Sequence, residues 1–77
     1  MYIQTRLKIL IAEKSLREGR KLPYHVIAEE TGLNPNTLVD YANSRATRFD
    51  ERVLITLCQY FACALSDLLV IVEGTRG

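Results

Sequence analysis

The sequence predicts an all-α domain built from five short helices, whose last apolar segment could instead extend as a tail. Apolar residues recur at intervals of three and four along much of the chain, which is the pattern of helices with one buried face. Gly, Pro, Asn and Asp interrupt this pattern where helices typically begin or end. The chain has 77 residues, of which 48% are hydrophobic and 25% are charged. This composition is typical of a globular protein, and we expect residues 1–77 to form a single domain.

The first two helices are expected on either side of a basic connector. The first begins at Gln4 or Thr5 and ends near Gly19, a residue type that readily closes a helix. The second begins at Pro23, whose missing N–H is not needed in a first turn, and closes at Gly32. The apolar stripe of the first helix consists of Ile3, Leu7, Leu10 and Ile11.

Three further helices follow. The clearest start is Asn34-Pro35, because Asn is a preferred N-cap and Pro fits the first helical position, so a helix is expected over residues 35–42. The others are expected over residues 51–63 and 67–70, after the caps Asp50 and Ser66. The inward residues of these helices are Leu38, Tyr41, Ala42, Leu54, Leu57, Cys58 and Phe61.

Residues 24–43 form the most informative segment, since they predict two short helices joined by a tight turn. Ala28 is small, which lets the following helix, residues 35–42, cross close to it, and Gly32 supplies the turn. Ile27 and Leu38 hold the two helices together. The outer face of the third helix, residues 35–42, is then free to enter a DNA major groove, so the segment is predicted to be a helix-turn-helix core.

An ordered set of motifs spans nearly the whole chain: Arg6-Leu7-Lys8, Leu10-Ile11-Ala12, the run from Ile27 to Leu33, Thr37-Leu38, Leu54, Leu57-Cys58, Phe61 and Ser66-Asp67-Leu68-Leu69. With these motifs the sequence resembles the Cro/CI-type (XRE-like) helix-turn-helix regulators. The resemblance implies a five-helix, lambda-repressor-like domain that binds specific double-stranded DNA and regulates transcription, with repression as the expected outcome.

The resemblance also implies which residues contact DNA. Base contacts are expected from the exposed side of the third helix and phosphate contacts from its start and the following loop. Family members often begin the second helix with a Gln that contacts phosphate, and here Tyr24 or His25 would take that role. The complete set of expected DNA-binding residues is Tyr24, His25, Asn34, Asn36, Thr37, Asp40, Asn43, Arg45 and Arg48.

Asp40 is unusual for a DNA-facing residue, because a carboxylate repels phosphates. It can read a cytosine amino group, bond a neighbouring Arg or point away from DNA, and a surface salt bridge is the favoured interpretation. The net charge is only +1. Any positive field toward DNA must therefore come from the arrangement of charges rather than from their total.

Other function classes find little support in the sequence. His25, Cys58 and Cys63 are too few and too poorly spaced for a zinc site, so no metal or cofactor is expected and the two cysteines are interpreted as reduced core thiols. No nucleophile–base set or phosphate-binding Gly loop indicates an enzyme, and no small-molecule effector site is evident. With neither a membrane-spanning run nor a signal peptide in the sequence, the protein is expected in the cytoplasm.

The C-terminal region is expected to form a homodimer. The run from Leu68 to Val72 is rich in β-branched residues and could be a strand that pairs with residues 1–3 or with a second copy of the chain. A dimer, with or without help from the first helix, would set two recognition helices roughly 34 Å apart. The apolar residues that exceed the needs of a small core are Ile9, Leu16, Val53, Ile55 and Val70–Val72.

A second function remains open. The mild charge, Asp40 and the missing Gln favour a protein-interaction module of the same fold, such as an antitoxin-like or phage accessory protein, without specific DNA reading.

Overall fold

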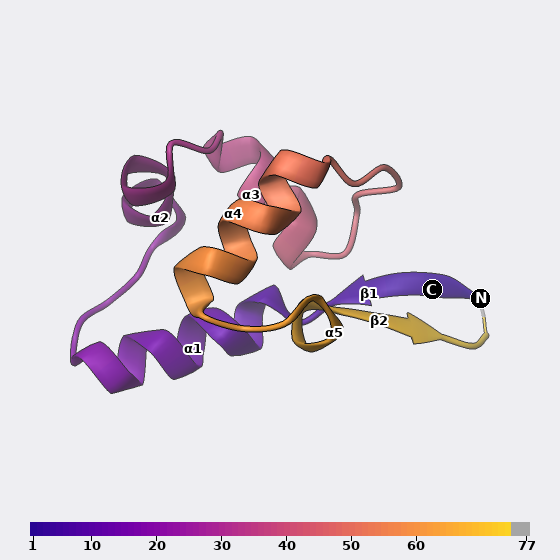
Figure 1. Cartoon of the computed structure of the whole chain (residues 1–77), viewed down its shortest axis with the longest axis horizontal. Coiled ribbons are helices and arrows are strands. Elements are labelled where there is room, and N and C mark those ends of the chain that lie inside the picture. The colour runs from indigo at the N-terminus through magenta and orange to yellow at the C-terminus, as the bar shows by residue number, and fades with distance from the viewer. Residues whose placement is uncertain (75–77) are drawn as a thin grey trace.

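A computed structural model describes residues 1–74 of the chain, and in these residues five helices and two short strands follow one another (Figure 1). The elements are β1 (Tyr2–Thr5), α1 (Leu7–Glu18), α2 (Tyr24–Thr31), α3 (Pro35–Ala42), α4 (Glu51–Phe61), α5 (Leu65–Leu68) and β2 (Leu69–Val72). The helices enclose a core of Leu7, Leu22, Ile27, Ala28, Leu38, Tyr41, Ala42, Leu57, Phe61 and Leu68. The five-helix prediction is confirmed. The sequence also predicts that residues 73–77 fray, and part of this segment lies outside the described residues.

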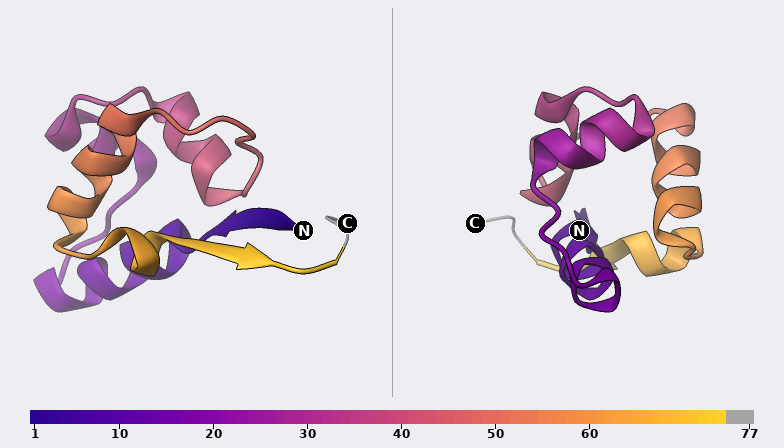
Figure 2. Two further views of the ribbon diagram at one scale, coloured as in Figure 1. Left: turned by 45° about the vertical axis from the view of Figure 1, so that its right-hand side comes forward. Right: turned by 90° about the vertical axis from the view of Figure 1, so that its left-hand side faces the viewer.

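The chain ends form an antiparallel strand pair. β1 and β2 pair from Tyr2 with Val72 to Thr5 with Leu69, so the C-terminal run takes the first of its two expected partners, the start of the chain. The helix predicted over residues 67–70 is wrong at Leu69 and Val70, because these residues are in β2. The predicted helix start at Gln4 or Thr5 is wrong, because these residues are in β1 and α1 begins only at Leu7. The strand pair continues the line of α1 and passes beside the loop between α3 and α4 (Figures 1 and 2).

The corner between α2 and α3 has the geometry that the sequence predicts. Gly32 ends α2 with a φ of +77°, and its N–H donates to the carbonyl of Ala28 at 2.8 Å. Asn34 caps α3, since its side chain accepts a hydrogen bond from the N–H of Asn36 at 2.8 Å. Because Leu38, Tyr41 and Ala42 are buried, α3 keeps its opposite side toward solvent.

The C-terminal helices differ from the prediction in their ends. α4 is capped by Asp50 as predicted, but it stops at Phe61 because Ala62 takes a left-handed conformation with a φ of +52°. The predicted cap Ser66 is wrong: α5 follows Ala64, whose N–H donates to Oδ2 of Asp67 at 3.1 Å. A cap contributed by a residue inside the helix is harder to recognise from the sequence than one just before it.

Candidate nucleic-acid interface

The outer side of α3 carries the residues predicted to face DNA. Asn34, Asn36 and Asp40 are exposed, and Thr37 is half-buried. The side-chain oxygen of Asn34 is occupied by the cap, which leaves its NH₂ group as its available donor. The structure thus gathers these four side chains at the surface of one helix, opposite the core.

The loop after α3 adds three of the predicted residues, Asn43, Arg45 and Arg48, all exposed. The N–H of Arg45 donates to the carbonyl of Asp40 at 2.8 Å, and this bond folds the loop back onto the end of α3. A surface hollow brings this loop together with α3 and the start of α4; its lining includes Thr37, Asp40, Arg45, Arg48 and Arg52. Arg52 in this lining was not anticipated, because it was assigned only to the helix that follows the loop.

Tyr24 and His25 lie apart from that hollow, in the first turn of α2. His25 is exposed, whereas Tyr24 is half-buried and packs against the core. Burial of the ring leaves Tyr24 less available to a ligand than His25.

The salt bridge favoured for Asp40 is not formed. In residues 1–74, Asp40 has no ion pair, although it lines the same hollow as three arginines. Its backbone carbonyl, rather than its carboxylate, holds Arg45. The carboxylate therefore faces solvent on the proposed reading surface.

Comparison with known families decides the relationship. Residues 6–74 match the family model of the Cro/C1-type helix-turn-helix DNA-binding domain. The chain belongs to this family. Neither the curated proteins nor the solved structures gave a significant match. The family match supports a DNA-binding regulator.

The charged side chains of the Cro/C1-type domain include a paired network and several unpaired cations. Glu18 and Glu30 bind Arg20 at 2.8 and 2.7 Å, Lys14 binds Glu18 at 2.6 Å, and the hydroxyl of Tyr60 donates to Glu30. This network links α1, α2 and α4 and removes Arg20, a residue of the basic connector between α1 and α2, from the free cations. By contrast, the side chains of Arg45, Arg48 and Arg52 form no ion pair in the described part of the chain.

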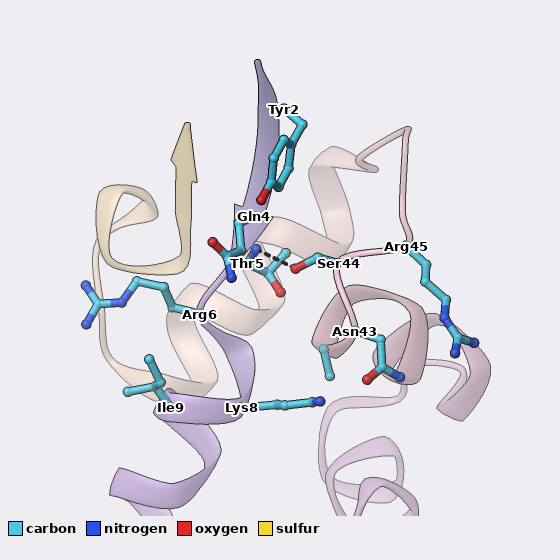
Figure 3. A pocket seen from close by; sticks show the side chains of 10 residues that line it. Tyr2, Gln4, Thr5, Arg6, Lys8, Ile9, Asn43, Ser44 and Arg45 are labelled. Atoms are coloured by element: carbon cyan, nitrogen blue, oxygen red, sulfur yellow. Dashed lines mark hydrogen bonds between the residues drawn. The ribbon is translucent and has the colours of Figure 1, made fainter. Parts of the chain in front are cut away.

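A second hollow in the Cro/C1-type domain lies between β1, the start of α1 and the end of α3 (Figure 3). Its lining includes Arg6, Lys8, Asn43 and Arg45. Arg45 therefore lines both hollows and connects them. Arg6 and Lys8 were missed as site residues, because nothing near them in the sequence shows that α1 begins beside the end of α3.

The other groups considered for chemistry are separate. Cys58 and Cys63 are free and half-buried, and burial raises the pKa of the Cys63 thiol. Among residues 1–74, no group of three or more His, Cys, Asp or Glu side chains is placed to hold a metal ion. In the same residues, no helix is both long and apolar enough to span a membrane.

Proposed function

We propose that the protein is a sequence-specific transcriptional regulator that inserts α3 into the DNA major groove and represses transcription. The observation that carries this proposal is the exposed polar side of α3 beside the unpaired Arg45 and Arg48. A helix presented in this way can reach base edges while neighbouring cations hold the phosphates. Residues 1–77 would act as one helix-turn-helix domain in the cytoplasm.

Each contact has a stated chemistry. Asn36 and Thr37 would read bases, and an Asn side chain pairs well with adenine. Asn34, Asn43, Arg45 and Arg48 would contact phosphates, while His25, with a smaller contribution from Tyr24, would approach the backbone from α2. Asp40 would accept a hydrogen bond from a cytosine amino group, since it has no ion pair in residues 1–74.

A homodimer formed through the strand end of the molecule, where β1, β2 and α5 lie together, would bring two recognition helices to the DNA. The exposed fractions of Ile55, Leu65 and Ile71 are 50%, 50% and 69%. Two apolar hollows across α4, α5 and the strands share Leu65 in their linings, which joins them into one surface. Of the residues predicted for this surface, Val53 instead packs against the core.

An alternative function is a protein-interaction module of the same fold. The unpaired carboxylate of Asp40 on the exposed side of α3 favours it, because a carboxylate there weakens attraction to phosphates.

DNA binding measured by fluorescence anisotropy against salt concentration separates the two functions. With about four phosphate contacts per chain, the slope of log K against log salt is expected near −4 for each bound chain and near twice that value for a dimer. The double variant Arg45→Ala/Arg48→Ala should reduce the magnitude of the slope by about 2 per bound chain and weaken binding to all sequences. Arg17→Ala removes an exposed, unpaired cation from the last turn of α1 and is the control. Wild-type protein that fails to bind any duplex at low salt would support the interaction module.

A further inference from the structure

The hollow between β1, α1 and α3 is a second basic site, separate from the outer side of α3. It has a volume of about 750 Å³. The residues that line it include three basic ones, Arg6, Lys8 and Arg45, and no acidic residue from the described part of the chain. A hollow with cations and no carboxylate favours an anionic ligand.

Lys8 is the residue best aimed into this hollow. Figure 3 shows its side chain extending from α1 toward the amide of Asn43, with Arg45 beyond, whereas Arg6 points to the other side. Lys8 is exposed and has no ion pair within residues 1–74. Its ammonium group, the Asn43 NH₂ and the Arg45 guanidinium are all hydrogen-bond donors that a phosphate oxygen accepts.

The walls of the hollow are joined by two hydrogen bonds, of which one is buried and the other partly buried. The N–H of Thr5 donates to Oγ of Ser44 at 3.1 Å, and the Thr5 hydroxyl donates to the carbonyl of Tyr41. Thr5 itself is only 7% exposed. These bonds fix β1, and with it the start of α1, against the end of α3. The backbone of Lys8 is thereby placed beside the end of α3 before any ligand arrives, so binding has to order the Lys8 side chain but not its backbone.

We propose that Lys8 and Asn43 bind a backbone phosphate of the DNA whose major groove α3 enters. This inference rests on the proposed function and extends its phosphate contacts from the α3–α4 loop to α1. Continuity supports DNA over a small phosphorylated ligand, because Arg45 lines both this hollow and the hollow beside Thr37 and Asp40. One polyanion can follow that connected surface, and a single small anion cannot.

The test compares Lys8→Gln with Arg17→Gln, which removes the same charge from the other end of α1. Binding to a random-sequence duplex and to a selected site is measured by anisotropy across a range of salt concentrations. Lys8→Gln should reduce the magnitude of the log–log slope by about 0.9 per bound chain and weaken binding to both duplexes by the same factor. Arg17→Gln should leave the slope unchanged. Circular dichroism melting should show both variants folded, since both side chains are exposed and unpaired in residues 1–74.

Three outcomes would overturn the inference while leaving the proposed function intact. The first is that wild-type protein binds DNA and that Lys8→Gln binds it with the same log–log slope. The second is that Lys8→Gln loses affinity for the selected site but not for the random-sequence duplex, which would make Lys8 a base-reading residue. The third comes from titration with inorganic phosphate followed by NMR: phosphate binding lost in Lys8→Gln, with DNA binding unchanged, would define a small-anion site. Absence of wild-type DNA binding would instead contradict the proposed function itself.

Discussion

At the scale of single residues, Glu30 joins three parts of the chain. Its carboxylate accepts two hydrogen bonds from Arg20, at 2.7 and 2.9 Å, and a third from the hydroxyl of Tyr60. The bonds from Arg20, followed by that from Tyr60, lower the pKa of Glu30 from 4.5 to about 2. A carboxylate with a lowered pKa stabilises the fold above its unfolded pKa, and that stabilisation is lost as pH falls.

The melting temperature of wild-type protein should therefore fall more steeply between about pH 4.5 and pH 2 than that of Glu30→Gln, because only wild type has this carboxylate to protonate. At pH 7 the variant should be modestly less stable, and the difference should shrink in high salt because the network is at the surface. Glu29→Gln is the matched control: its carboxylate is exposed and unpaired in the described residues. Parallel melting curves against pH for wild type and Glu30→Gln would contradict the prediction.

Residue roles that depend on near neighbours could be predicted from the sequence. Asn34 and Asp50 cap the helices that follow them by accepting hydrogen bonds from N–H groups two or three residues further along the chain, and both predictions are confirmed. Thr5 and Lys8 could not be assigned, since their surroundings come from the end of α3, more than thirty residues along the chain. The favoured salt bridge of Asp40 failed for a related reason, because residue spacing does not fix where a loop arginine points.

At the scale of elements, the start of the chain shows why helical spacing alone was insufficient. Ile3 and Leu7 have the spacing of a helix face, yet Ile3 is in β1. Strand formation here depends on Ile71, its partner from the opposite end of the sequence. Long-range pairing of this kind overrides local periodicity, and only the β-branched composition of the C-terminal run indicated it.

The end of α4 gives an element-scale prediction. Ala62 is exposed and holds a left-handed φ of +52°, a conformation that costs an alanine about 1–2 kcal/mol and a glycine much less. Ala62→Gly should raise the free energy of unfolding by roughly 0.5–1 kcal/mol after the added freedom of the unfolded chain is subtracted. Urea denaturation measures the change. Ala12→Gly, at an exposed position inside α1, should lower stability by about 1 kcal/mol. Changes of the same sign in both variants would argue against strain at Ala62.

At the scale of the whole molecule, near-neutrality conceals a separation of charge. The ion-pair network of Lys14, Glu18, Arg20 and Glu30 ties together α1, α2 and the connector between them. Four of the unpaired cations, Lys8, Arg45, Arg48 and Arg52, instead line the two connected hollows, one of which also holds Asp40 and Asp50. A net charge of +1 therefore says little about the field that DNA would meet. The sequence predicted the need for such an arrangement but not its position, because the position depends on which carboxylates the fold pairs.

The strand end of the molecule gives the prediction for assembly. In the described residues β2 pairs only with β1, so its other edge is open, and an open apolar edge favours pairing with another chain. Ile71→Glu should convert a dimer into a monomer in sedimentation velocity and halve the salt slope of DNA binding, because one chain then contacts half the phosphates. The folded monomer should tolerate the change, since Ile71 is 69% exposed. Leu16→Glu, at an 86% exposed residue near the end of α1, is the control. Dissociation by Leu16→Glu alone would move the interface to α1, and wild-type protein that stays monomeric at high concentration would exclude the dimer.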